Sequence, residues 1–556
     1  MTDTGTVNIP FSGLFARING MSAKRVALVA TLVFAVLSSA LIVFHEPWLD
    51  EAQAWLIARD ASYYDMLFNL PHIEGHIAFW WLILSVPAKL GLPYEIGLKA
   101  VNIFIAVLAC AVFEFKSPFP NAFKIVFPFT YFFFYQYSVI ARPYMLLILA
   151  LFLVAVTFAK REEKPLWHLL ALALLCLADT FGIAIAGGIA LGWVIRLIKN
   201  IAKKNGENTG RNVRQAVCLF ALLLLALFLM WSITPSSDAS ATGSITAGNV
   251  VMTFLAEIFV LPSELCFTSF LQYGILTLKD ISPFAIALTA VISIAIWFFF
   301  VKAVMRRDIL ADIILPVLMF IALGSFYIYS HHYGLYLMVG IYCAWISLET
   351  RSEKKASGDL TSVIGYILCA VSLFAGLIWT GFASVNDICH PYWVSRDLYS
   401  WVEANKLEDA KWFAAWDIEV NEDTEEIIKM NTAVTRETVP VNPYMPSKRP
   451  INFNNEGYTY ALFRDNTEEQ NKKDIEEWKK EGEPDLILCS DILETKKLMG
   501  IMGYGSTYDI VYVKECRNSW KTDFTKGGVI VLARRDNGLD ITGDLKDMPS
   551  ILGTEG

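Results

Sequence analysis

Residues 24–51 read KRVALVATLVFAVLSSALIVFHEPWLDE, and this stretch decides how the rest of the chain is interpreted. Its centre, Val26 to Phe44, is an unbroken apolar run close to the roughly 20 residues that one helix needs to cross a bilayer. Lys24 and Arg25 precede the run and no convincing small-residue cleavage site follows it. We therefore interpret it as a retained first span and not as a signal peptide. The acidic pair Asp50-Glu51 comes just outside it.

The composition of the whole chain agrees with a membrane protein of many spans. Of its 556 residues, 55% are hydrophobic and only 18% are charged, which is typical of a bilayer-embedded chain and not of a soluble one. The net charge of -8 is uneven, because residues 385–556 hold 21 Lys and Arg against 32 Asp and Glu. This last part is therefore expected to be polar, acidic and water-facing. The sequence contains no block of basic residues that would indicate nucleic-acid binding.

Charge bias between the apolar stretches predicts the topology. Loops rich in Lys and Arg, which stay cytoplasmic, occur near 160–164, 199–214, 302–307 and 351–355. All four fall on one side if the chain starts in the cytoplasm and crosses the membrane about eleven times. The predicted spans lie near 26–44, 97–114, 124–140, 144–159, 165–180, 182–198, 214–232, 283–304, 309–329, 334–348 and 361–383.

The same reasoning divides the chain into a cytoplasmic tail (1–23), a transmembrane domain (24–385) and a soluble extracytoplasmic domain (386–556). Two outward loops are long, 45–95 and 234–282. Within the first, His76 to Leu92 is apolar but short and contains Pro87, so we expect a helix lying in the outer interface. Four cysteines, Cys266, Cys389, Cys489 and Cys516, would face outward, and the sequence does not choose a disulfide pairing among them.

The soluble domain alternates helix and strand patterns, which predicts a small α/β fold. Helical patterns cover 396–405 and 466–480, and strand patterns cover 411–417, 485–489, 508–514 and 528–533. The fold class predicted for the whole chain is thus an α-helical polytopic membrane protein of about eleven transmembrane helices, with a C-terminal extracytoplasmic α/β domain.

Polar residues that could carry chemistry gather on the predicted outer side. Asp50 and Glu51 open the first outward loop, and adjacent carboxylates cannot share one helical face, so each can have a separate role. Charged groups near membrane depth are costly and usually line a cavity or pathway. The residues on the same side are Glu74, His76, Arg142, Tyr144, Asp179, His331 and His332. For the acidic pair, for Arg142 and for the two histidines, ordinary contact with lipid headgroups or interfacial water is the competing interpretation.

These residue types suit transfer of a sugar from a lipid phosphate. Arg and His can hold a phosphate leaving group, and a carboxylate can accept the proton of an attacking hydroxyl. A carboxylate and a cation on the outer side would thus act beside a membrane-bound donor.

The order of these motifs resembles the GT-C glycosyltransferases, specifically the family of protein O-mannosyltransferases and lipid A aminoarabinose transferases. In that family an Asp-Glu pair opens the first outward loop, as Asp50-Glu51 does here. A His-Pro-Pro run then leads an interfacial helix, and Gly75-His76-Ile77 stands in its place without the prolines. A Ser-x-x-x-Arg-x-Tyr-like stretch is matched by Ser138 to Tyr144. A late His motif is matched by His331-His332-Tyr333, and Asp179 stands where the family often has Thr-His-Tyr. The similarity covers roughly residues 20–385.

The resemblance implies a role for each matching residue. Asp50 would be the catalytic carboxylate, with Glu51 assisting or ordering the site. Arg142, Tyr144, His331 and His332 would contact the donor phosphate, and Glu74, His76 and Asp179 would bind substrate. The donor would be a polyprenyl-phosphate sugar, transferred with inversion to a protein, lipid or glycan hydroxyl at the cell membrane. Some GT-C relatives use a divalent metal held by carboxylates from the first two outward loops, and such a metal remains an alternative here. Because the second outward loop, Gln136 to Tyr144, has no carboxylate, we expect no metal and no other cofactor.

Two other functions remain open from the sequence. A transporter or flippase of lipid-linked sugars would also be polytopic with intramembrane charges, although its polar residues would be expected at the midplane. A membrane scaffold that binds envelope material through the acidic domain would need fewer spans. The sugar and the acceptor are not indicated.

Overall fold

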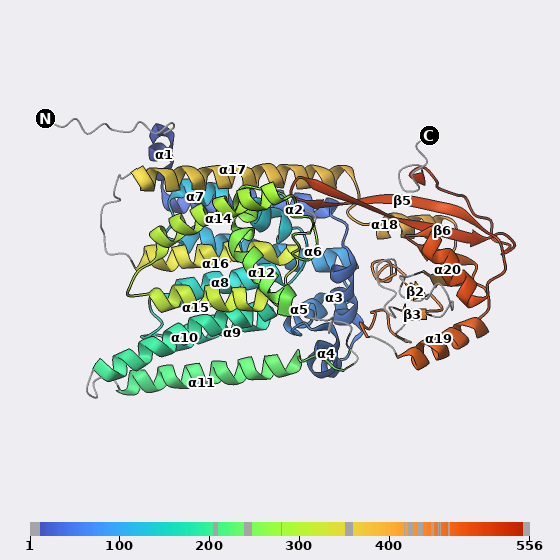
Figure 1. The fold of residues 1–556 in the computed structure, drawn as a ribbon, viewed down its shortest axis with the longest axis horizontal. Coiled ribbons are helices and arrows are strands. Elements are labelled where there is room, and N and C mark those ends of the chain that lie inside the picture. The colour runs from blue at the N-terminus through green and yellow to red at the C-terminus, as the bar shows by residue number, and fades with distance from the viewer. Residues whose placement is uncertain are drawn as a thin grey trace.

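The structure is a computed structural model in which an elongated bundle of helices carries a small sheet domain at one end (Figure 1). The described residues are 12–203, 209–237, 239, 247–279, 281–350, 360–415, 418–420, 427–430, 438–445, 450–453, 455, 457–464 and 467–548. The basic residues Arg351, Lys354 and Lys355 of one predicted loop lie outside them.

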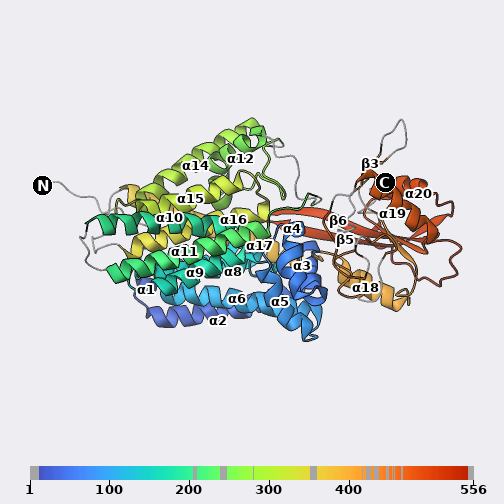
Figure 2. The same cartoon turned by 90° about the horizontal axis from the view of Figure 1, so that it is seen from below.

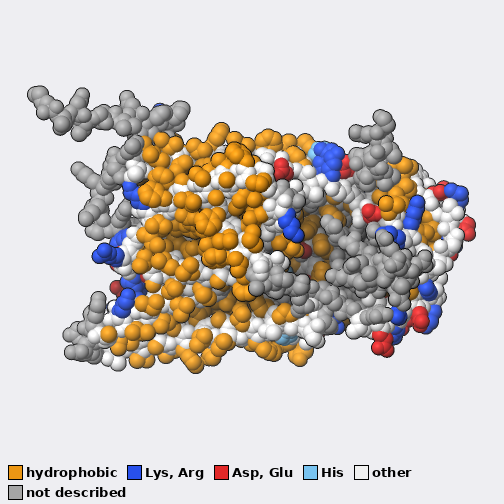
Figure 3. Space-filling view, viewed as in Figure 1, with side chains coloured by type: hydrophobic (Ala, Val, Ile, Leu, Met, Phe, Trp, Pro, Cys, Tyr) orange, Lys and Arg blue, Asp and Glu red, His pale blue; other side chains and the backbone are white. Residues whose placement is uncertain are grey.

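Six described helices are long and apolar enough to cross a membrane. The space-filling view shows a broad apolar band over the bundle, with charged side chains gathered beyond it (Figure 3). Burying such a surface in lipid removes it from water, which is the driving force for insertion. The six helices are α2 (Ala23–Phe44), α6 (Tyr94–Lys116), α10 (Thr180–Lys203), α11 (Thr209–Ser232), α14 (Pro283–Val304) and α17 (Leu360–Cys389).

The number of spans supported by length and composition is thus six, not eleven. The other predicted spans are shorter or broken in the structure. The stretch 124–140 divides into three pieces, since Pro128 lacks the N–H that a continuous helix needs. These pieces and the remaining bundle helices are α7 (Asn121–Val126), η2 (Phe127–Phe129), η3 (Phe132–Gln136), α8 (Tyr144–Phe158), α9 (Pro165–Ala178), α12 (Ala247–Phe259), α13 (Leu261–Cys266), α15 (Leu310–Gly324) and α16 (Ser330–Glu349).

Short helices fill the segment 45–95 at the sheet end of the bundle, which we define as the end where α2 finishes and α8 begins (Figure 2). The predicted helix His76 to Leu92 forms over Phe79–Lys89 (α5), with Pro87 inside it, and α5 packs on α3. The others are α3 (Leu49–Asp60), η1 (Asp65–Asn69) and α4 (Leu70–Glu74). Helix α1 (Ser12–Asn19) belongs to the N-terminal segment.

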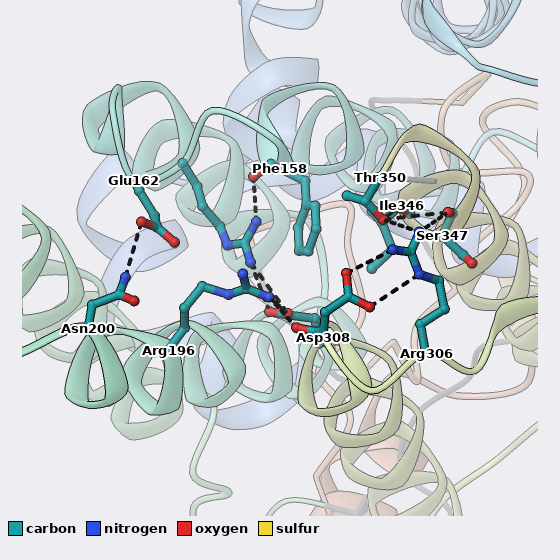
Figure 4. A network of polar contacts seen from close by, with 11 residues as sticks. Phe158, Glu162, Arg196, Asn200, Arg306, Asp308, Ile346, Ser347 and Thr350 are labelled. Carbon is teal, nitrogen blue, oxygen red and sulfur yellow. Dashed lines mark hydrogen bonds and ion pairs between the residues drawn. The ribbon is translucent and has the colours of Figure 1, made fainter. Parts of the chain in front are cut away.

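The far end of the bundle carries a network of ion pairs between predicted cytoplasmic segments (Figure 4). Asp312 at the start of α15 is buried and pairs with Arg161 at 3.3 Å and with Arg196 at 3.0 Å. Arg211 pairs with Glu162 at 3.0 Å. These contacts place the segments near 160 and 199–214 and the start of α15 together, at the end opposite the sheet domain.

The sheet domain follows α17 and contains the four strands that the sequence predicts. Their order in the sheet is β1-β4-β6-β5, with β1 parallel to β4 and the other pairs antiparallel. Strands β5 and β6 form a long hairpin whose closed end reaches the helical bundle (Figures 1 and 2). The elements are α18 (Ser395–Ala404), β1 (Trp412–Ala414), β2 (Ile418–Val420), β3 (Ile427–Met430), α19 (Glu468–Lys480), β4 (Leu486–Cys489), α20 (Ile492–Met502), β5 (Tyr508–Trp520) and β6 (Asp523–Arg534).

Candidate functional site

Helix α3 gives the two acidic residues different surroundings. Consecutive helical residues point about 100° apart, whereas residues three and four apart share a face. Asp50, Gln53 and Ala54 accordingly line one cavity, while the side chain of Glu51 turns away and is buried, with 1% of its surface exposed. The separation of the two carboxylates expected from the sequence is confirmed.

The cavity beside Asp50 brings together residues from distant parts of the sequence. It lies at the sheet end of the bundle and has a volume of about 50 Å³. Its polar lining comes from α3, α4 and the segments before α5, α8 and α10, and a side chain of the sheet domain completes it. The lining includes Asp50, Gln53, Glu74, His76, Trp80, Trp81, Arg142, Asp179 and Phe463.

Asp50 and Arg142 form the charged centre of this cavity. Asp50 Oδ2 lies 3.0 Å from Arg142 Nη1, and the side chains are 32% and 7% exposed. The guanidinium also lies over the rings of Tyr144 and Trp48, at 5.0 and 5.9 Å from their centres. Aromatic faces attract a cation without using its N–H groups, so the hydrogen-bonding capacity of Arg142 is kept.

Two nitrogens at the cavity are buried and make no hydrogen bond to any described residue. They are Arg142 Nη1, whose contact with Asp50 is an ion pair without hydrogen-bond alignment, and Trp80 Nε1. Buried polar groups in native proteins nearly always have partners. Hydrogen-bond donors that lack a partner at the wall of a cavity indicate a ligand with acceptor oxygens.

Glu51 fixes the backbone around Asp50. Its carboxylate accepts hydrogen bonds from the N–H of Ala141 at 2.6 Å and of Trp48 at 3.2 Å. It also lies 3.0 Å from Nε2 of His45, whose Nδ1 lies 3.0 Å from Asp387 at the end of α17. Glu51 thus ties the start of α3 to the segment that carries Arg142.

The imidazole of His45 is held between two carboxylates. Burial lowers the pKa of His45, but Glu51 and Asp387 outweigh it and raise the pKa to about 9. His45 is therefore protonated at neutral pH, and its charge balances the buried carboxylates.

Burial shifts the pKa of each of three cavity residues, Glu74, Asp179 and His76, toward the neutral form. It raises the pKa of Glu74 to about 8, with a further contribution from the charge of Asp50. It also raises the pKa of Asp179 to about 6 and, together with Arg142, lowers the pKa of His76 to about 4. At neutral pH, Glu74 therefore carries a proton that it can donate, and His76 is uncharged.

The two histidines at the start of α16 lie behind Arg142. Nδ1 of His332 accepts the N–H of Tyr329 at 3.0 Å, so its Nε2 carries the proton and donates to Tyr144 Oη at 2.9 Å. The hydroxyl hydrogen of Tyr144 is then available to an oxygen acceptor. The His331 ring stacks on Tyr144 with centres 5.7 Å apart. Neither histidine lines the cavity itself.

Sequence reasoning missed two contributors to the site. Gln53 donates to Glu74 at 2.9 Å and exchanges two hydrogen bonds with the backbone of Ala461, at 2.7 and 3.0 Å. The two hydrogen bonds between Gln53 and Ala461 hold Phe463 of the sheet domain at the cavity. The position of Gln53, three residues after Asp50, could have revealed it, whereas no local signal marks Phe463.

A second, larger cavity adjoins the first. Its volume is about 590 Å³, and residues of α4 and of the segment 455–464 line it. Ile73 and Leu462 line this larger cavity, whereas the residues that follow them in the chain, Glu74 and Phe463, line the cavity beside Asp50. Neighbouring residues of the chain thus line different cavities.

Among the described residues, no group of three or more His, Cys, Asp or Glu side chains is arranged to hold a metal ion. No protein-family model and no curated protein matches this chain significantly.

Proposed function

We propose that this protein is a membrane glycosyltransferase of the GT-C type, which transfers a sugar from a polyprenyl-phosphate donor to an acceptor hydroxyl. One observation carries the proposal. Asp50, Glu74, His76, Arg142 and Asp179, selected from the sequence for this chemistry, line one cavity in the structure. Such a transfer requires a carboxylate to accept a proton and a cation to hold the phosphate. The cavity offers both, together with an uncharged acid and an uncharged imidazole that can form hydrogen bonds.

The reaction is a single displacement at the anomeric carbon. The acceptor oxygen attacks C1 of the sugar while the bond from C1 to the phosphate oxygen breaks, which inverts the configuration. Asp50 accepts the proton of the acceptor hydroxyl. Arg142 binds the phosphate and stabilises the charge that develops on it as polyprenyl phosphate leaves. Inversion requires the acceptor oxygen to approach C1 on the face opposite the phosphate. The sugar would therefore lie between Asp50 and Arg142, which form an ion pair at 3.0 Å when no substrate is bound.

The surrounding residues position this pair. Glu51 orients the backbone at Trp48 and Ala141 and does not line the cavity beside Asp50, so we assign it an ordering role. Tyr144, oriented by His332, lies outside the cavity lining and against the guanidinium of Arg142, so we assign it a role in positioning Arg142. Glu74 donates a proton in a hydrogen bond to a sugar hydroxyl, and His76 accepts one.

The proposed topology has eleven passes, with the sheet domain and the site on the extracytoplasmic side. The ion pairs at the far end support it, since they join segments rich in Lys and Arg that are expected to stay cytoplasmic. The six long apolar helices account for part of the count, and α7 to η3, α8, α9, α15 and α16 would make the remaining passes. A donor with its lipid in the outer leaflet would then reach the cavity from the membrane.

Asp50→Asn tests the assignment directly. Purified protein in lipid nanodiscs is incubated with labelled polyprenyl-phosphate sugars and membrane acceptors. We expect transfer to fall by about 10²- to 10⁴-fold, the range for removing a general base, with the melting temperature nearly unchanged. Asp308→Asn is the matched control, because it removes the same charge from an exposed ion pair at the far end.

Transfer that persists undiminished in Asp50→Asn would contradict the assignment of the base. Labelled lipid that crosses a vesicle membrane without being consumed would favour a transporter instead.

A further inference from the structure

Lys521, at the tip of the β5–β6 hairpin, is a buried cation placed against the helical bundle. Only 1% of its side chain is exposed, and Nζ lies 3.4 Å from the carboxylate of Glu264. Nζ also donates to the backbone oxygens of Glu264 at 2.5 Å and Thr268 at 2.8 Å, and lies 4.5 Å from the centre of the Trp379 ring. A charge is costly to bury unless partners surround it, and the bundle supplies all of these partners.

The neighbouring Trp520 makes a second attachment. Its Nε1 donates to the backbone oxygen of Leu271 at 3.0 Å, and its ring lies 6.0 Å from that of Tyr273. Lys521 itself has a φ of +54°, a left-handed conformation that residues other than glycine seldom adopt. Such a conformation persists where the surrounding structure determines it.

Glu264 connects Lys521 to the loop that follows α13, because its carboxylate also binds that loop. Its carboxylate accepts hydrogen bonds from the N–H groups of Phe270 and Leu271, at 3.0 Å each, and from Thr268 Oγ1 at 2.5 Å. The loop therefore folds around one carboxylate, whose charge Lys521 balances.

The loop in turn pairs with the segment that enters α16. Ser330 N donates to Gly274 O at 2.8 Å, Gly274 N donates to Ser330 Oγ at 3.1 Å, and Ile275 bridges Tyr329. The next residues along the chain are the histidine pair that lies behind Tyr144 and Arg142.

A ring contact leads from the same loop to the charged centre. Tyr273 lies 6.5 Å from Trp48, ring centre to ring centre, and the guanidinium of Arg142 lies over Trp48. The hairpin tip thus reaches the phosphate side of the site by two routes, through the backbone of 274–276 and through aromatic packing.

We propose that Lys521 is a positioning residue for the candidate phosphate site, and that the sheet domain is an integral part of that site. Through Glu264, Lys521 holds residues 268–276, and these hold the start of α16. This inference rests on the proposed function for its catalytic meaning, but the mechanical coupling can be tested without it.

Hydrogen–deuterium exchange of the full-length protein in nanodiscs tests the coupling. Lys521→Met keeps the apolar stem and removes the charge. We expect exchange to rise by about tenfold or more in residues 268–276 and 328–334, as weakened hydrogen bonds open more often. Lys526→Met is the control, because that lysine lies on the same hairpin and is 60% exposed.

Trp520→Phe provides a milder variant in case Lys521→Met does not fold. It retains an aromatic ring and removes the hydrogen bond to Leu271, so the same segments should exchange faster. Unchanged exchange in these segments, or an equal rise in Lys526→Met, would overturn the inference.

Binding of polyprenyl phosphate separates this inference from the proposed function. We expect Lys521→Met to weaken its binding by about tenfold, whereas Lys526→Met should bind as the wild type does. If the wild type does not bind polyprenyl phosphate at all, the proposed function is contradicted and the exchange result still decides the coupling. If the wild type binds and Lys521→Met binds equally well, the positioning role is wrong.

Discussion

Single residues at the sheet end show how adjacent carboxylates acquire opposite roles. Asp50 faces the cavity and pairs with Arg142, whereas Glu51 pairs with His45 and accepts a hydrogen bond from the backbone of Ala141. The helical rotation between consecutive residues is sufficient to cause this difference. Substitutions at the two positions should therefore differ in kind, with lost transfer at Asp50 and lost stability at Glu51.

The charge of His45 makes a prediction about stability and pH. The pKa of His45 in the folded protein, about 9, lies above the ordinary histidine value of 6.5. The stabilisation is therefore complete below about pH 6.5 and is lost as the pH rises through 9. The shift corresponds to about 3 kcal/mol. Thermal unfolding in nanodiscs should show His45→Gln destabilised most at pH 6, with the difference from wild type shrinking towards pH 10.

A parallel series on His390→Gln, a position outside this cluster, should show a much smaller effect. A constant difference between wild type and His45→Gln across the pH range would show that the imidazole is not charged in the folded protein.

Among the elements, α10 and α15 pack most closely where glycines remove side chains from the contact. A Cβ added at Gly188 would lie 2.5 Å from the backbone of Pro316, whereas one at Gly187 would meet only Met319 Cε at 3.8 Å. Gly188→Ala should therefore destabilise the protein by about 1–3 kcal/mol, since overpacking forces the backbone to shift.

The neighbouring Gly187→Ala is the matched control and should be neutral or slightly stabilising, because alanine favours helix. Melting temperatures of the two variants, measured under one condition, check the packing. Equal melting temperatures would contradict the close approach of α10 and α15.

The elements also show what the sequence could and could not reveal. Apolar length predicted α2, α6, α10, α11, α14 and α17, because each carries enough apolar surface by itself. The stretch 124–140 looked like one span, but it divides into α7, η2 and η3 around Pro128. The strands of the sheet domain were predictable from their apolar pattern, whereas the docking of their hairpin on the bundle depends on long-range contacts such as Lys521 with Glu264.

On the scale of the whole molecule, the candidate site was predictable in its members but not in its boundaries. Loop charges predicted that Asp50, Arg142 and Asp179 would lie on one side of the membrane, and the structure brings the three residues to one cavity. The sequence could not place the sheet domain at that cavity. No local sequence pattern marks Phe463 or the two hydrogen bonds between Gln53 and Ala461. The sheet domain therefore contributes Phe463 to the lining of a cavity that the helical segments otherwise form.

The proposed function requires Asp50 and Arg142 to act together in sugar transfer, and a double-mutant cycle measures this coupling. Initial rates of transfer from a labelled polyprenyl-phosphate sugar are measured for Asp50→Asn, Arg142→Gln and the double variant. Residues that act as a unit give non-additive losses, so the double variant should be about as slow as the slower single variant. Losses that multiply, or transfer that survives in all three variants, would contradict the account.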